Sequence, residues 1–322
     1  MTKKIVGMIS SYPGLEQGDW LWQQTPEPMG IWQNIQMLAQ AEHPDFLLLY
    51  NFNQFPVLPP KKPFSLGHYR HQQRYAQEMQ VLQAKLKGVP PERVIFLWRE
   101  PPLEEVVART INTYDRAKPY CGYISGADDY APQPDYMPAI WYHSNSFREL
   151  DSMAPPAKVK SCSWITSGVS RTANHLQRLD FLRSVQTAPV DCDIYGLNLP
   201  PWVKSRGELK NKWHGMAPYY YNLAIENFTA NDRYVSEKLW DALLAWCLPI
   251  YYGGSAADKL LPKESFLRLP SLDAKGLAYI QDVTSNPDLW LERKEAIAEA
   301  RHIILHKLNL LSWLHRFINT HN

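Results

Sequence analysis

The sequence predicts an α/β protein with parallel sheets, built from two domains. Residues 46–50 (F-L-L-L-Y) form a continuous apolar run bounded by polar residues, which is typical of a strand covered on both faces. Residues 219–254 read as a strand, a polar loop, a helix and a second strand, which together make a βαβ unit. At 322 residues the chain is long enough for two domains, which we place at 1–150 and 151–322.

Composition and charge narrow the class of partner. Hydrophobic residues make up 45% of the chain and charged residues 20%, which is ordinary for a globular protein. The formal charge of +2 is close to neutral, whereas proteins that grip nucleic acid usually carry a clear basic excess. We therefore expect no nucleic-acid partner, and phosphate recognition only at one small ligand.

The start of the chain and its cysteines bear on the compartment. The first apolar run, 5–9, is too short for a signal sequence or a membrane span and reads as the first strand. The four cysteines are scattered without ligand spacing, as reduced core residues are. We expect a cytoplasmic protein without an integral membrane segment, while the oligomeric state stays open.

The first half alternates predicted helices and strands. Apolar residues between 31 and 39 fit one face of a helix, and a polar helix is expected over 68–87. The Pro-rich segment 51–67 is long and irregular, which makes it a candidate binding loop. An apolar strand over 93–98 delivers Glu100 to its carboxyl end, the usual position of a working residue in an open α/β sheet.

The second half continues the alternation after a linker. Residues 144–160 have a linker's composition and hold the predicted domain boundary. A strand over 159–166, a helix over 175–185 and a strand over 193–196 follow. Residues 289–317 read as closing helices with one strongly apolar face.

The βαβ unit at 219–254 organises this half. Ser236 stands at the cap position of its helix with Glu237 in the first turn, and Pro249 is expected to end the helix. Such units gather polar groups from the strand end and the first helical turn around one crevice, where α/β folds hold nucleotides. The unit is therefore the predicted nucleotide site.

The same unit resembles the signature of the α-1,3/4-fucosyltransferases, glycosyltransferase family ten. Residues 224–227 (A-I-E-N), 234–240 (Y-V-S-E-K-L-W) and 248–254 (L-P-I-Y-Y-G-G) are similar to the family's A-F-E-N, D-Y-V-T-E-K-L and P-V-Y-G. A looser likeness covers 96–101, 120–125 and 136–142. The resemblance implies a GT-B fold, in which two Rossmann-like domains with parallel sheets face each other across a cleft. The first domain would bind the acceptor and the second the GDP-sugar.

The resemblance also implies an activity. It is inverting transfer of L-fucose from GDP-fucose to a hydroxyl of a glycan acceptor, without metal or cofactor. Secretory-pathway members carry an amino-terminal membrane anchor, so the short first run predicts the bacterial type. Two alternatives stay open: a family-ten enzyme that uses another GDP-sugar, and a non-catalytic module that binds a nucleotide sugar or glycan.

This transfer requires one carboxylate as a base for the acceptor hydroxyl and a few cations to stabilise the departing diphosphate. It requires no general acid, because a nucleoside diphosphate is already a good leaving group. Glu100 is the candidate base, although a surface glutamate after a strand is the alternative. Arg178 and Lys238 are the candidate diphosphate ligands, with Arg171 and Arg183 close to Arg178 in sequence.

Four more residues complete the donor site that the resemblance implies. Glu226 and Asn227, which end the strand, would meet the fucose. Tyr234 would contact the nucleoside. Glu237 would accept hydrogen bonds from ribose or fucose hydroxyls, and a plain helix-capping role is compatible with that.

No metal site is predicted. Asp128 and Asp129 form a single acidic pair, which we interpret as a solvated turn. His143, His175 and His302 show no ligand spacing. The same holds for His214.

Overall fold

The computed structural model describes residues 3–12, 19–58 and 66–321. The chain divides into two compact units, Met1–Met137 and Pro138–Asn322. The predicted boundary at 150/151 falls inside the second unit because the preceding segment is bonded to that unit's last helices. Ala139 forms a parallel bridge with Asn309, and the Arg301 guanidinium donates to the Leu150 carbonyl at 2.5 Å.

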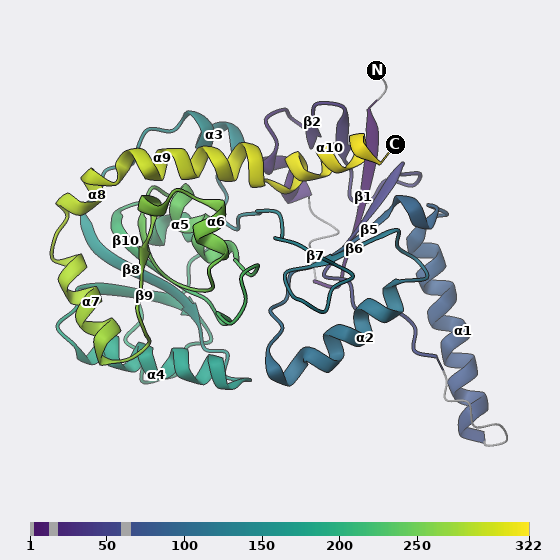
Figure 1. Cartoon of the computed structure of the whole chain (residues 1–322), viewed down its shortest axis with the longest axis horizontal. Helices are drawn as coiled ribbons and strands as arrows, with labels where there is room; N and C mark the ends of the chain where they lie inside the picture. Colours follow the sequence, from purple (N-terminus) through teal and green to yellow (C-terminus); the bar gives the residue numbers. More distant parts are fainter. Residues whose placement is uncertain (1–2, 13–18, 59–65, 322) are drawn as a thin grey trace. The chain divides into compact units, whose positions relative to one another are not determined.

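The first unit is built on one sheet of order β2-β3-β1-β4-β5-β6-β7. Every pairing is parallel except that of β2 with β3. The strands are β1 (Lys4–Ser10), β2 (Ile31–Trp32), β3 (Ile35–Met37), β4 (Phe46–Tyr50), β5 (Val94–Trp98), β6 (Tyr123–Gly126) and β7 (Gln133–Pro134). Its α-helices are α1 (Leu66–Leu86) and α2 (Val107–Ala117) (Figure 1).

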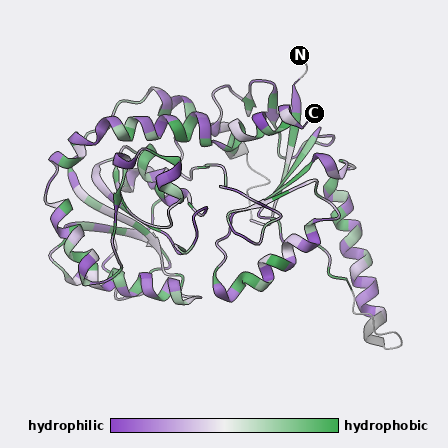
Figure 2. Cartoon of the chain, viewed as in Figure 1, coloured by the Kyte–Doolittle hydropathy of each residue, from purple (hydrophilic) through white to green (hydrophobic). Residues whose placement is uncertain are grey.

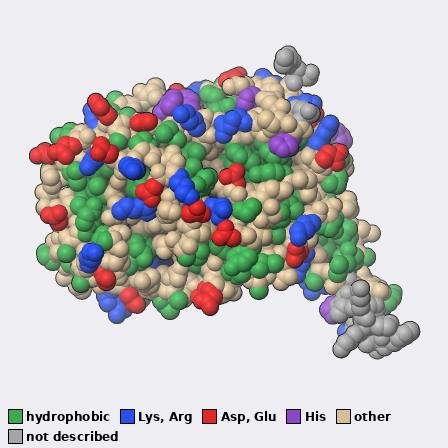
Figure 3. All heavy atoms as spheres, in the orientation of Figure 1, with side chains coloured by type: hydrophobic (Ala, Val, Ile, Leu, Met, Phe, Trp, Pro, Cys, Tyr) green, Lys and Arg blue, Asp and Glu red, His purple; other side chains and the backbone are tan. Residues whose placement is uncertain are grey.

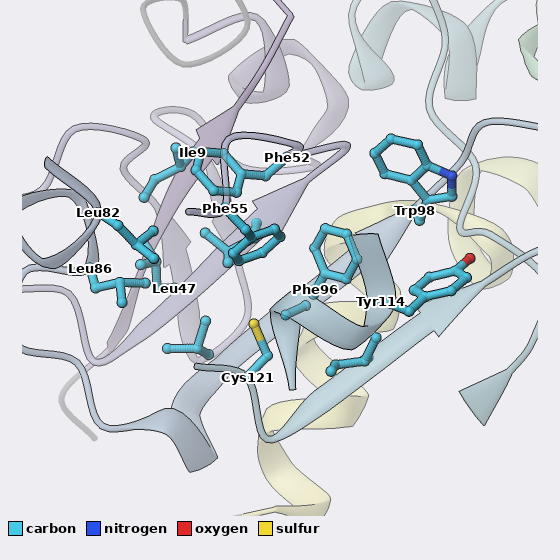
Figure 4. Close-up of a cluster of buried hydrophobic side chains, with 14 of the residues drawn as sticks. Ile9, Leu47, Phe52, Phe55, Leu82, Leu86, Phe96, Trp98, Tyr114 and Cys121 are labelled. Atoms are coloured by element: carbon cyan, nitrogen blue, oxygen red, sulfur yellow. The ribbon is translucent and has the colours of Figure 1, made fainter. Parts of the chain in front are cut away.

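The core of the first unit is rich in aromatic rings, as Figure 4 shows. Every residue of β4 and β5 is buried, and for β4 this confirms the prediction of a strand covered on both faces. Phe55 meets Phe96 edge to face at 5.6 Å, and Phe96 meets Tyr114 in the same way at 6.2 Å. Edge-to-face packing places the positive rim of one ring against the negative face of the next.

The helix predicted between 31 and 39 is wrong. The segment forms β2 and β3, an antiparallel pair whose turn holds Gln33 at a φ of 52°. Ile35 and Met37 are buried and β3 pairs with β1, so sheet pairing overrides the helical spacing. The helix predicted over 68–87 is confirmed as α1, and residues 59–65 of the candidate binding loop lie outside the described residues.

The second unit is built on a parallel sheet of order β12-β11-β10-β8-β9. Its strands are β8 (Lys160–Ser167), β9 (Cys192–Leu197), β10 (Tyr219–Ile225), β11 (Leu248–Tyr252) and β12 (Leu267–Arg268). Its helices are α3 (Phe147–Ser152), α4 (Ala173–Thr187), α5 (Glu237–Leu244), α6 (Ala256–Leu260), α7 (Ala274–Thr284), α8 (Asp288–Glu292), α9 (Lys294–His302), a π-helix (Ile303–Leu308) and α10 (Leu310–Thr320). The strands predicted over 159–166 and 193–196 are confirmed as β8 and β9, and the helix predicted over 175–185 is confirmed as α4. The βαβ unit predicted over 219–254 is confirmed as β10, α5 and β11.

Helices lie on both sides of the second sheet: α4 on one side, and on the other α5, which packs on β10 and β11 and carries α9 on its outer side (Figure 1). Helices α4 and α9 alternate hydrophobic and hydrophilic residues along their length (Figure 2). Such alternation lets one stripe of a helix bury against the sheet while the other faces water.

The prediction that Pro249 ends the helix is wrong. The α5 helix ends at Leu244, Trp246 turns the chain at a φ of 61°, and Pro249 lies inside β11. The Tyr251 carbonyl accepts from the Leu269 amide on the β12 side. Pro249, two residues earlier, faces that same side, where β12 pairs only with Ile250 and Tyr251. The missing N–H of proline therefore costs no ladder hydrogen bond.

None of the helices in the described part of the chain is long and apolar enough to cross a membrane. On the face drawn in Figure 3, basic and acidic side chains lie among one another. This mixture agrees with the near-neutral formal charge and differs from the basic stripe of a nucleic-acid-binding face.

A carboxylate at the edge of the second sheet makes stability depend on pH. Asp193, whose side chain is 11% exposed, accepts from Lys160, Arg206 and Tyr219 at 2.7 to 2.8 Å. Burial alone would raise the pKa of Asp193, but these hydrogen bonds outweigh it and lower the pKa to about 2. Because this is below the unfolded value, the ionised group stabilises the fold above about pH 4, and the contribution is lost as the pH falls toward 2.

We expect Asp193→Asn to reduce the free energy of unfolding at pH 7 by about 1–2 kcal/mol, a figure discounted because Lys160 and Arg206 are solvent-exposed. Urea unfolding of both proteins at pH 7 and pH 3 measures the effect. The gap should narrow at the lower pH. An equal gap at both would show that ionisation of Asp193 does not contribute.

Candidate functional site

A cavity of about 440 Å³ opens at the carboxyl edge of the second sheet. Ser167 at the end of β8 and Leu223 on β10 line it. The chain runs from β8 to β9 on one side and returns to β10 on the other, so the strand order reverses between β8 and β10. Open α/β sheets bind ligands at such a switch point.

Arg178 on α4 gives this cavity a buried cation. The residue is 3% exposed, yet it lines the cavity. Its guanidinium donates to the Asn227 Oδ1 at 2.7 Å and to the Ser167 carbonyl at 2.9 Å, and these acceptors are neutral. Its buried Nε has no hydrogen-bond partner among the described residues, and burial lowers the pKa of Arg178 to about 10. A buried cation without a counter-charge favours an anionic ligand.

Lys238 lines the cavity from the first turn of α5. Ser236 caps this helix, as predicted, by accepting from the Lys238 amide. The Lys238 ammonium lies 3.2 Å from the Glu226 carboxylate, which also accepts from the Ser236 amide at 2.8 Å and hydroxyl at 2.7 Å. Burial works against the charged form of Lys238, but Glu226 and Glu237 outweigh it and raise its pKa. Lys238 therefore stays charged at neutral pH.

Lys212 is a third cation at the cavity, and sequence reasoning missed it. Its ammonium lies 3.0 Å from Asp241, a fully buried residue of α5 whose other oxygen accepts from the Tyr142 amide at 2.9 Å. Burial lowers the pKa of Lys212, but Asp241 and Glu237 outweigh this effect and raise it. The available signal was Asp241 itself, because a carboxylate on the apolar face of a helix requires a buried partner.

The remaining predicted donor residues divide into two groups. Asn227 and Glu237 line the cavity with Arg178 and Lys238. Glu226 and Tyr234 are buried and are not among the described residues that line it. The Glu226 carboxylate holds Lys238 and Ser236, and the Tyr234 ring packs edge to face on Phe228 at 6.1 Å.

Glu100 lies in the first unit, where it follows the end of β5 as predicted. It is half-buried. The neighbouring Arg99 amide donates to the Asn51 Oδ1 at 2.6 Å, and the Arg99 guanidinium bonds the Tyr50 hydroxyl. The carboxyl ends of β4 and β5 are thereby tied together beside Glu100.

Two interpretations about metal ligands need correction. Asp128 is not in a solvated turn: it is fully buried and accepts from the Tyr114 hydroxyl at 2.6 Å. His302 does have a neighbour at ligand spacing. One ring nitrogen of His302, one of His306 and a carboxylate oxygen of Asp151 lie within 4.8 Å of one another.

The chain has a fold of the GT-B type, which confirms the predicted fold class. A crystal structure of Anabaena HepE in complex with UDP-glucose aligns with 98% of this chain and 98% of its own, at 11% identity and a TM-score of 0.54. The family match is narrower. Residues 155–294 match the model of glycosyltransferase family 10 (fucosyltransferase), C-terminal part, in agreement with the resemblance found in the sequence.

Curated relatives agree with this match. The chain is 30% identical over 136 residues to alpha-(1,3)-fucosyltransferase C of Drosophila melanogaster, which is 42% of this chain and 31% of the relative. It is 30% identical over 140 residues to the human 3-galactosyl-N-acetylglucosaminide 4-alpha-L-fucosyltransferase FUT3, which is 42% of this chain and 36% of the relative. The matched part thus spans less than half of each relative's length.

Proposed function

We propose that the protein is an inverting, metal-independent fucosyltransferase that moves L-fucose from GDP-fucose to a hydroxyl of a glycan. The observation that carries the proposal is the set of cations at the switch point of the second sheet: Arg178, Lys212 and Lys238 line one cavity. A nucleoside diphosphate brings the negative charge that this cavity lacks beside Arg178. The family match over 155–294 supports fucose as the sugar.

In this proposal Arg178 and Lys238 bind the diphosphate directly. The guanidinium fork can reach two phosphate oxygens at once, and Lys238 adds a point charge where the N-terminus of α5 is already positive. Asn227 aims Arg178 through their 2.7 Å hydrogen bond. Glu226 acts by positioning, because its carboxylate is fully engaged with Ser236 and Lys238.

The hydroxyl groups of the donor need acceptors at the same cavity. Glu237 lines it and is half-buried, so we assign Glu237 to ribose or fucose hydroxyls. For Tyr234 we replace the predicted nucleoside contact by a packing role, since its ring lies buried against Phe228. Lys212, held by Asp241, extends the positive wall.

Transfer itself needs one base. The acceptor hydroxyl attacks C1 of fucose while the Glu100 carboxylate takes its proton. The bond between C1 and the diphosphate oxygen breaks, and GDP leaves with the electron pair on phosphates held by Arg178 and Lys238. A single displacement from the opposite face inverts the configuration at C1.

The first unit offers a place for part of the glycan. Phe52 and Val57, from the candidate binding loop 51–67, line a cavity of about 460 Å³ together with Arg74 and Lys85 of α1. Aromatic faces and charged hydrogen-bond donors are side-chain groups that bind sugars in protein sites. We assign this cavity to the acceptor.

A donor panel followed by a transfer assay tests the proposal. With EDTA present, GDP and GDP-fucose should raise the melting temperature, and UDP-sugars should not. An array of glycans incubated with labelled GDP-fucose should then show transfer. The anomeric configuration of fucose in the product should be opposite to that in the donor. No shift with any GDP compound would contradict the proposal, and binding without transfer on any glycan would favour the non-catalytic module.

A further inference from the structure

The second unit carries a cluster of potential metal ligands that is separate from the proposed donor-binding residues. The Asp151 carboxylate at the end of α3 accepts a hydrogen bond from His306 Nε2 at 2.7 Å. The rings of His302 and His306, four residues apart in the closing helices, stack at 4.3 Å between centroids. We propose that Asp151, His302 and His306 form a binding site for a divalent transition-metal ion, with Zn²⁺ as the best fit.

The spacing of the three groups suits a tetrahedral ion. Zinc holds nitrogen and carboxylate ligands at ~2.0–2.2 Å, which puts the ligand atoms ~3.3–3.6 Å apart in a tetrahedron. In the chain all three lie within 4.8 Å of one another, with one pair at 2.7 Å. All three side chains are exposed or half-buried, so small rotations bring them into range.

The backbone beneath the cluster is held in place. The buried Arg301 guanidinium donates to the Leu150 carbonyl at 2.5 Å, and these residues are the sequence neighbours of His302 and Asp151. The Phe147 ring packs edge to face on His306 at 5.0 Å. His306 lies in a π-helix, a distortion often found at functional sites. The two segments are therefore fixed before a metal arrives.

The ligand chemistry selects the ion. Two imidazoles and one carboxylate suit Zn²⁺, Cu²⁺ or Ni²⁺, whereas Ca²⁺ and Mg²⁺ require more oxygen ligands. Three protein ligands leave a fourth position for water. None of the three residues lines the donor cavity among the described residues, so this site is independent of the proposed transfer. A bound ion would tie α3 to the closing helices and stabilise the fold.

Calorimetric titration of the untagged, EDTA-stripped chain with ZnCl₂ tests the proposal. We expect one ion per chain. Because changing even an outer partner of a metal ligand costs about 10–100-fold in affinity, His302→Ala should weaken binding by at least about 10-fold. Asp151→Asn should act in the same direction. His315→Ala, a histidine of α10 outside the cluster, is the matched control and should bind zinc as the wild type does.

Thermal melting gives a second readout that does not depend on activity. Zinc should raise the melting temperature of the wild type and of His315→Ala, and this rise should vanish in His302→Ala, whose melting temperature without zinc should be unchanged. The proposal is overturned if no ion binds, if His302→Ala and Asp151→Asn bind zinc as tightly as the wild type, or if His315→Ala loses affinity equally.

Discussion

In the Glu100→Gln variant, kcat for fucose transfer should fall by about 10²–10⁴-fold, because the amide cannot take the proton of the acceptor hydroxyl. Gln keeps the size and the hydrogen-bonding reach of Glu, so the fold should be unchanged. GDP binding should also be unchanged, because Glu100 belongs to the first unit and the donor cavity to the second. Initial rates of GDP release at saturating donor, on a glycan found with the array, measure the effect.

The control for this variant is Glu104→Gln. Glu104 is an exposed residue in the short helix that follows Glu100 in the sequence. Its kcat should equal that of the wild type. If Glu100→Gln kept its full kcat, Glu100 would not be the base. A loss of GDP affinity equal to the loss of kcat would instead show that Glu100 serves donor binding.

The second large effect is expected at Arg178. Lysine keeps the charge but lacks the planar fork, so Arg178→Lys should lose the two-oxygen contact with the diphosphate and its bonds to Asn227 and Ser167. Hydrogen bonds to charged groups contribute ~1.5–3 kcal/mol, so the affinity for GDP should fall ~10–100-fold. Calorimetric titration with GDP measures this, and affinity for guanosine should change little.

Arg183→Lys supplies the matched control on the same helix. Arg183 is exposed and stacks on Trp202 with 4.6 Å between the guanidinium carbon and the ring centroid. Its variant should bind GDP normally. Because Arg178 is buried, melting temperatures of both variants are needed to separate lost binding from lost fold. A folded Arg178→Lys protein with wild-type GDP affinity would remove Arg178 from the donor site.

The parts of the fold that could be predicted are those that depend on residues close together in the sequence. The continuous apolar run of β4 and the helix cap at Ser236 depend on neighbours within a few residues. The resemblance to family ten also placed Arg178, Asn227, Glu237 and Lys238 in one donor site, and all four line one cavity. Their roles in binding and transfer are still predictions.

What could not be predicted depends on partners far along the chain. Residues 31–39 form strands because β3 pairs with β1. Pro249 is tolerated in a strand because β12 pairs only with Ile250 and Tyr251, so no partner requires an N–H at position 249. Lys212 joins the cavity through Asp241, and local sequence does not show which cation pairs with that buried carboxylate. The spacing of His302 and His306 was readable, but Asp151 completes the cluster only in three dimensions.

The central claim is that Arg178 and Lys238, rather than a divalent ion, neutralise the donor diphosphate. Calorimetric titration of GDP in EDTA, with the wild type and Lys238→Met compared side by side, tests it most directly. The account predicts tight, metal-free binding of GDP by the wild type and a loss of at least ~10-fold in the variant, whose ammonium is gone. Binding that appears only when Mg²⁺ or Mn²⁺ is added, or equal affinity in both proteins, would contradict it.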